Sequence, residues 1–211
     1  MSHPVGRFGG VLFPISCPVC GDAGAAPCSS CAARLHPAPM LRCPAGLDAC
    51  AAVLSYDGVG RELVARLKYR ANRAALSSVA AAMARLVEAE QVDLVTWVPT
   101  SSQRRRHRGF DHAELLARAV ARAVRRPCQS LLRRRPGPPQ TGRSLAERRR
   151  GPSFEVRGPS PARVLIVDDV VTSGATVTAA ASALRSAGAL EVRAVVAART
   201  PPKVHTRYEW K

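Results

Sequence analysis

The sequence predicts an α/β protein, in which helices flank a mostly parallel sheet and a small cysteine-rich module precedes it. From residue 51 onward, short apolar runs alternate with segments of helical periodicity, which is the order of elements in an α/β domain. Residues 1–50 differ, because they hold six of the seven cysteines and seven prolines with little periodicity of either kind. We therefore expect two units, a cysteine-rich module over 1–50 and an α/β domain over 51–211.

The α/β region begins with a strand and two helices. AAVLSY at 51–56 predicts a short strand, and the following YDGVG predicts a turn. RELVARLKYR at 61–70 and LSSVAAAMARLVEAE at 76–90 carry apolar residues at helical spacing. VDLVTWV at 92–98 is a β-branched run that stops before Pro99, so it predicts a buried strand of a parallel sheet.

The second half of the chain continues the alternation. A helix is predicted to begin after Asp111, with Glu114 completing a capping box. Residues 133–162 are rich in Arg, Gly and Pro and predict an exposed loop, whereas RVLIV at 163–167 has the character of a buried strand. A helix over 176–187 and a strand, LEVRAVVAA, complete the pattern.

Charge and hydropathy restrict the partners. The chain of 211 residues has 32 Lys and Arg against 15 Asp and Glu, a net charge of +17. This excess favours anionic partners such as phosphorylated metabolites, nucleic acid or lipid headgroups. No apolar stretch approaches the roughly 18 residues of a membrane span, and the first residues lack a signal-peptide pattern. We therefore expect a cytoplasmic protein without a membrane span.

Four cysteines have the spacing of a metal site. CPVCG at 17–21 and CSSC at 28–31 together give C-x2-C-x7-C-x2-C. Each C-x2-C folds into a tight knuckle that directs two thiolates to one ion, and four thiolates form a closed tetrahedral site for structural Zn²⁺. Iron with the same ligands and free thiols remain alternatives. Cys43 and Cys50 are left out of this set; the expected ligands are Cys17, Cys20, Cys28 and Cys31.

The most informative stretch is VLIVDDVVTSGATV at 164–177. In parallel sheets, ligands bind beyond the carboxyl ends of the strands, and Asp168 and Asp169 stand after VLIV. Adjacent carboxylates repel each other unless water, a cation or sugar hydroxyls accompany them. The small residues that follow lead into a helix whose free backbone amides favour an anion. Acids for a polyol beside amides for a phosphate predict a ribose 5-phosphate site.

This stretch resembles the signature of type I phosphoribosyltransferases, which bind phosphoribosyl pyrophosphate (PRPP). The resemblance implies that Asp168 and Asp169 contact the ribose hydroxyls and act in catalysis. It also implies a type I phosphoribosyltransferase-like fold for the sheet domain, and Mg²⁺ bound with PRPP. The PRPP-binding residues that it implies here are Val170, Thr172, Ser173, Gly174, Ala175 and Thr176.

The cysteine knuckle followed by this signature resembles the ComF family, which is linked in some bacteria to competence and DNA uptake. VPTSSQRRRHRGFDHAELLA at 98–117 is similar to a family segment, and the resemblance extends from Cys17 to about Ala198. It implies that the loop after the first sheet strand holds the pyrophosphate, through Pro99, Thr100, Ser101, Arg104 and Arg108. Arginines suit a leaving group whose negative charge develops. A mobile loop at 140–150 is implied to close over the site.

The main hypothesis is therefore a PRPP-binding protein that transfers phosphoribosyl to an unidentified acceptor and releases pyrophosphate. A second hypothesis is an adaptor that handles single-stranded DNA and docks a helicase-like competence partner, with a non-catalytic PRPP site. The arginine clusters at 104–108, 133–135 and 148–150 favour it, but few aromatic residues are available for base stacking. A PRPP sensor without turnover is the third.

Overall fold

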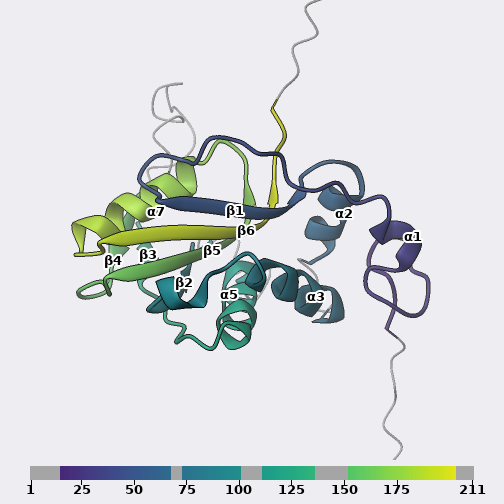
Figure 1. Ribbon diagram of the computed structural model, residues 1–211, viewed down its shortest axis with the longest axis horizontal. Coiled ribbons are helices and arrows are strands. Elements are labelled where there is room, and N and C mark those ends of the chain that lie inside the picture. Colours follow the sequence, from purple (N-terminus) through teal and green to yellow (C-terminus); the bar gives the residue numbers. More distant parts are fainter. Residues whose placement is uncertain (1–14, 68–72, 101–110, 136–151, 203–211) are drawn as a thin grey trace, which may run out of the picture.

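A computed structural model describes residues 15–67, 73–100, 111–135 and 152–202 of the chain. Its centre is a parallel four-stranded sheet of order β1-β6-β5-β2 (Figure 1). The strands are β1 (Ala49–Ser55), β2 (Leu94–Trp97), β5 (Arg163–Val171) and β6 (Glu191–Arg199). The predicted fold class, a parallel sheet flanked by helices with a four-cysteine module before it, is confirmed.

Helices cover both faces of the sheet. One face contacts α2 (Gly58–Arg66), α3 (Arg73–Ala84) and α5 (His112–Ala123), with the short 3-10 turn η1 (Ala89–Gln91) leading into β2. The other face contacts α7 (Ala175–Ser186), over which the antiparallel pair β3 (Leu132–Arg134) and β4 (Phe154–Val156) lies. Figure 1 shows α7 on the opposite side of the strands from α3 and α5.

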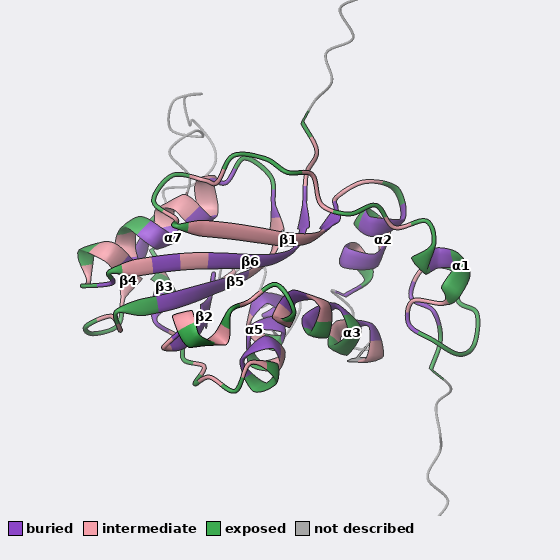
Figure 2. Ribbon diagram, in the orientation of Figure 1, coloured by how far each residue is buried: buried purple, intermediate pink, exposed green. Residues whose placement is uncertain are grey.

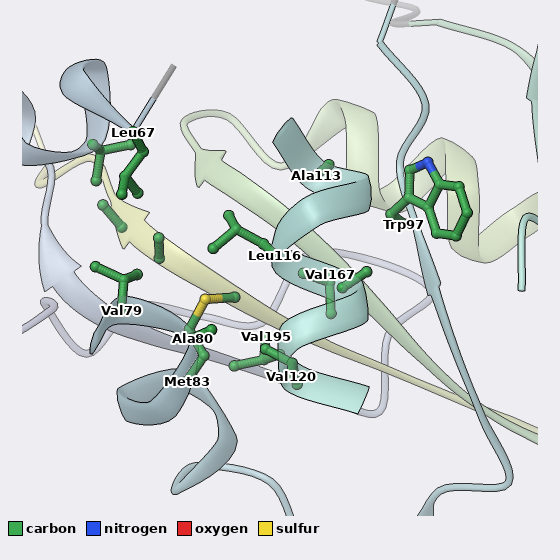
Figure 3. Close-up of a cluster of buried hydrophobic side chains, with 14 of the residues drawn as sticks. Leu67, Val79, Ala80, Met83, Trp97, Ala113, Leu116, Val120, Val167 and Val195 are labelled. Carbon is green, nitrogen blue, oxygen red and sulfur yellow. The ribbon is translucent and has the colours of Figure 1, made fainter. Parts of the chain in front are cut away.

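The central strands are buried on both sides, which explains their continuous apolar runs. In β5, Leu165 and Val167 pack toward α3 and α5, whereas Val164 and Ile166 pack toward α7. Figure 2 colours most of β5 and β6 as buried, and Figure 3 shows the core on the α5 side, where Leu116 and Val120 approach Val167 and Val195.

Strand β5 is longer than the sequence predicted. The apolar run was expected to end at Val167, with Asp168 and Asp169 beyond it, but the strand continues to Val171 and pairs Asp168 with Val196 of β6. The alternation of its faces is broken at the two acids, because Val167 and Val170 pack into the same core cluster. The apolar residues after the acids account for the extension, since they have core to enter on both faces.

The exposed loop predicted over 133–162 is wrong in part. Phe154 is buried against the α7 side of the core, and β4 pairs with β3 in antiparallel register. The Arg- and Gly-rich composition gave no strand signal here, because Phe154 is the one aromatic residue that attaches this short strand to the core. Residues 136–151 lie outside the described residues.

Helix α5 begins as predicted, with Asp111 as its N-cap. Asp111 Oδ1 accepts a hydrogen bond from the amide of Ala113 at 3.1 Å. Only half of the predicted capping box is present: the Glu114 amide is among the backbone donors to the Asp111 carboxylate, but the Glu114 carboxylate pairs with Arg118, at 2.9 Å. The cap therefore depends on Asp111 alone.

The cysteine module contacts the sheet domain at α2. Cys17 and Cys31, the latter in the short helix α1 (Ser29–Ala32), are buried in a cluster with Val59. The chain then follows the edge of β1, where the amide of Ser55 donates to His36 O at 2.9 Å. Among the described residues, no helix has the length and apolar character that crossing a bilayer requires.

Candidate functional site

The turn after β5 presents a helix N-terminus at the carboxyl edge of the sheet. Gly174 is the N-cap of α7 and has φ +79°, a left-handed conformation that glycine adopts without strain. Ala175 N lies 3.4 Å from Ser173 Oγ. Among the described residues, no protein atom accepts a hydrogen bond from the amides of Ser173, Gly174 or Thr176. These donors and the helix dipole together suit an anion.

Asp168 and Asp169 lie near the end of β5, a few residues before these amides, and both are half-buried. Strand β2 ends opposite Val167, and beyond that point the amide of Asp169 donates to Asp168 Oδ1 at 2.8 Å. Burial, with the negative charges of Asp169 and Asp111, raises the pKa of Asp168 well above its ordinary value. A partner with hydroxyl donors or positive charge would relieve this strain.

Asp111 links the start of α5 to the loop after β2, at the carboxyl edge of the sheet. Its side chain is buried, and Oδ2 accepts a hydrogen bond from the amide of Thr100, in the loop after β2, at 2.8 Å. Burial raises the pKa of Asp111, against the lowering effect of the Thr100 and Ala113 amides. The sequence identified Asp111 only as a cap, and its bond to Thr100 had no sequence signal.

The predicted site residues are only partly within the described chain. Asp168, Asp169, Val170 and the turn from Thr172 to Thr176 form one contiguous corner with α7. Pro99 and Thr100 follow β2, the strand next to β5, and are half-buried. Ser101, Arg104 and Arg108, together with the predicted mobile loop at 140–150, lie outside the described residues.

The four predicted metal ligands come together. The Sγ atoms of Cys17, Cys20, Cys28 and Cys31 all lie within 4.8 Å of one another. Gly21, directly after the first knuckle, has φ +86°, a left-handed conformation that glycine adopts readily. Burial alone would raise the pKa of Cys17, but backbone hydrogen bonds around it lower the pKa to about 6. A cluster of four sulfur ligands fits Zn²⁺, with no position left for a substrate.

Cys43 and Cys50 are separate from this cluster. Burial raises the pKa of Cys50 to about 11, although the positive charge of Arg199 opposes the rise. Burial likewise raises the pKa of Cys43, whose Sγ lies 3.6 Å from Leu47 O. Both therefore remain neutral thiols near Arg199, a buried residue at the end of β6 that sequence reasoning missed.

A groove of about 660 Å³ lies elsewhere, between β4 and α7. Its walls include Phe154 and the small residues Ala179, Ser182 and Ala183. It lies along the side of α7 rather than at the helix N-terminus, so it is distinct from the corner formed by the acids and the turn.

Comparison with known proteins gives a match over the part of the chain that contains this corner. Residues 113–211 match the phosphoribosyl transferase domain. This match covers slightly less than half of the chain and includes both aspartates, the glycine turn, α7 and β6. A comparison with curated proteins gave no match.

Three solved structures illustrate the similarity. The chain is similar to purine phosphoribosyltransferase from Pyrococcus horikoshii Ot3, with 15% identity, a TM-score of 0.42, and coverage of 60% of this chain and 83% of that chain. The similarity to orotate phosphoribosyltransferase from Aeropyrum pernix has 21% identity and a TM-score of 0.36, and it covers 64% of this chain and 62% of that chain. The similarity to glutamine PRPP amidotransferase from B. subtilis, complexed with ADP and GMP, has 26% identity and a TM-score of 0.40. It covers 57% of this chain but only 25% of that chain, so the match spans a quarter of that enzyme.

Proposed function

We propose that this protein binds PRPP at the corner formed by the end of β5 and the N-terminus of α7, and transfers its phosphoribosyl group to an acceptor. The observation that carries the proposal is the conjunction of two features. Asp168 and Asp169 are followed within a few residues by the backbone amides of Ser173 and Gly174, which have no protein acceptor among the described residues. The match of residues 113–211 to the phosphoribosyl transferase domain supports it.

The turn from Thr172 to Thr176 would hold the 5-phosphate. Its amides supply hydrogen bonds, and the positive end of the α7 dipole favours the negative charge. The exposed hydroxyls of Thr172 and Ser173 offer further donors. A side chain at Gly174 would disturb this turn, because the left-handed backbone there would be strained and the added Cβ would crowd Pro44.

Asp168 and Asp169 would receive the ribose hydroxyls. As the bond from the sugar carbon C1 to pyrophosphate lengthens, positive charge develops on the ring, and two nearby carboxylates stabilise that charge. A lone pair of the acceptor forms the new bond to C1, and the electron pair of the breaking C1–O bond leaves with pyrophosphate. The loop after β2 would hold the pyrophosphate through Pro99, Thr100, Ser101, Arg104 and Arg108. The hydrogen bond from the Thr100 amide to Asp111 fixes the start of this loop.

The carboxylates fit Mg²⁺, which prefers oxygen ligands. In the described part of the chain, the four cysteines are the one cluster of three or more potential ligand groups. A magnesium ion at the acid pair would therefore take most of its ligands from PRPP and water. Such an ion supplies charge neutralisation of the pyrophosphate oxygens.

The cysteine module supports assignment to the ComF family. We propose that residues 1–50 form a structural zinc module and that residues 51–211 form the phosphoribosyltransferase-like domain. Reduced cysteines that bind zinc are typical of a reducing compartment, so the proposed location is the cytoplasm.

Calorimetry with PRPP and Mg²⁺ tests the proposal. Wild-type protein should bind PRPP, and the Asp168→Asn, Asp169→Asn double variant should bind at least tenfold more weakly, because two charge-assisted contacts are lost. Mass spectrometry of reactions containing PRPP with nucleobases and amines would identify the acceptor through a product that appears together with pyrophosphate. Absence of PRPP binding by the wild type would refute the proposal, whereas binding without any product would leave a PRPP sensor.

The net charge of +17 favours a second candidate function, an adaptor that binds single-stranded DNA and a helicase-like partner. Binding through phosphate neutralisation should weaken steeply with salt, because counterions are released. A gel-shift series from low to physiological salt separates the two functions. A shift that disappears with salt would support the adaptor, and no shift at low salt would exclude it.

A further inference from the structure

The segment between the cysteine module and β1 lies against the candidate phosphate turn. This segment, residues 36–48, is called the connector below. It first pairs with the edge of β1, where the amide of Ala38 donates to Val53 O at 3.2 Å. Figure 1 shows it continuing past the strand toward α7 before it turns back into β1. The edge pairing protects β1, but it does not account for the path that follows.

Arg199 fixes the middle of the connector to the sheet. It is the last residue of β6, pairs in register with Val171 of β5, and is only 7% exposed. Its Nη1 donates to Leu41 O at 3.3 Å, and its Nη2 donates to Arg42 O at 2.6 Å. Within the described ranges, Nε has no acceptor, so these two carbonyls hold the guanidinium. Bonds from a buried charged donor are strong and costly to lose.

Pro44 is the part of the connector that contacts the turn. A Cβ placed on Gly174 would lie 2.9 Å from Pro44 Cβ and 3.0 Å from Pro44 Cγ. The proline ring therefore lies directly behind the glycine whose left-handed conformation opens α7. Such a contact restricts the backbone of the turn and hence the direction of its amides.

The connector is fixed on the far side of Pro44 as well. Arg185 of α7 donates from Nε to Gly46 O at 3.0 Å and from Nη2 to Asp48 Oδ2 at 2.6 Å. Pro44 is thus held between an anchor on α7 and an anchor on β6, whose last residue pairs with Val171 at the end of β5, just before the turn. Because Arg185 is partly exposed and Arg199 is buried, Arg199 is the stronger anchor.

We propose that Arg199 is a positioning residue for the phosphate turn, and that it acts by holding Pro44 against Gly174. The inference rests on the proposed function, because it assigns a purpose to the wall behind the 5-phosphate site. A preorganised set of amides binds phosphate without the cost of ordering the turn at the moment of binding. Loss of the wall should therefore weaken recognition of the 5-phosphate while leaving the proposed pyrophosphate contacts, which belong to the loop after β2, intact.

Calorimetry with ribose 5-phosphate on the full-length protein tests the inference. Arg199→Met and Pro44→Ala should each weaken binding by about tenfold, and the double variant should lose no more than Arg199→Met alone, because both changes remove one contact. Arg199→Lys should restore part of the affinity. The controls Arg193→Met, on the same strand but paired with Glu191, and Pro39→Ala, on the connector away from Gly174, should bind like the wild type.

A phosphorus resonance measurement separates positioning from general loosening. In bound PRPP, Pro44→Ala should shift the 5-phosphate resonance and leave the pyrophosphate resonances unchanged. If the wild type binds neither ribose 5-phosphate nor PRPP, the proposed function itself fails. If the wild type binds but Arg199→Met and Pro44→Ala both bind as tightly as the wild type, or if all resonances move together, the inference is overturned. Should Arg199→Met not fold, Pro44→Ala and the resonances decide.

Discussion

At the scale of single residues, the acid pair places charge where the fold disfavours it. Asp168 is half-buried beside Asp169, and burial and that neighbouring charge raise its pKa. A protein core gains nothing from such a pair, so its presence at the sheet edge is a stability cost that a ligand can relieve.

Replacing Asp168 by Asn should therefore stabilise the free protein. The folded pKa lies above the unfolded value of about 4, so ionisation of Asp168 costs folding free energy as pH rises from about 4 through the folded pKa. Asn keeps the oxygen that accepts from the Asp169 amide. We expect the unfolding midpoint to rise by about 4 °C at pH 8 and by less at pH 5, as measured by calorimetric scans. A lower midpoint at pH 8, or a difference independent of pH, would contradict this assignment.

Gly174 combines a left-handed backbone conformation, which only a substituted side chain would strain, with a close neighbour. Gly174→Ala should weaken PRPP binding by about tenfold or more, because a left-handed alanine costs roughly 1–2 kcal/mol and its Cβ would meet Pro44 at 2.9 Å. Gly158→Ala is the matched control, since Gly158 has φ +82° but no atom within 4 Å of the added Cβ. Titration calorimetry should show a loss for the first variant alone; equal losses would mean that backbone strain acts globally.

At the scale of elements, the cysteine module should be an independent metal site. Elemental analysis of purified protein should find about one zinc per chain, because four clustered thiols form one closed tetrahedral site. Cys31→Ser should lose the metal, whereas Cys50→Ser, which changes a neutral thiol in β1, should retain it. Retention of zinc by Cys31→Ser, or its loss in Cys50→Ser, would contradict the ligand set.

Local patterns predicted elements well where their cause was local. The apolar run from Val164 identified β5, since a strand buried on both faces needs core on each, and Asp111 identified the start of α5. The extension of β5 to Val171 depends on pairing with β6, which no single segment encodes. The contact between Pro44 and Gly174 joins distant parts of the chain, so the sequence gives no sign of it.

At the scale of the whole molecule, positive charge is in excess even after local pairing. Carboxylates such as Asp93, Asp48 and Glu155 are already engaged by Arg163, Arg185 and Arg133. With a net charge of +17, few acids remain to compete for the other arginines, so the field around the molecule attracts anions. Such a field would favour a phosphorylated sugar and nucleic acid alike, whereas the corner at α7 favours the phosphorylated sugar of the proposed function.

The most direct test of the account is therefore the affinity for PRPP with Mg²⁺ at physiological salt, measured by calorimetry for the wild type and for the Asp168→Asn, Asp169→Asn variant. The account predicts saturable binding near one PRPP per chain by the wild type and a loss of at least tenfold in the variant. Equal affinity in the two proteins, or no binding by either, would contradict it.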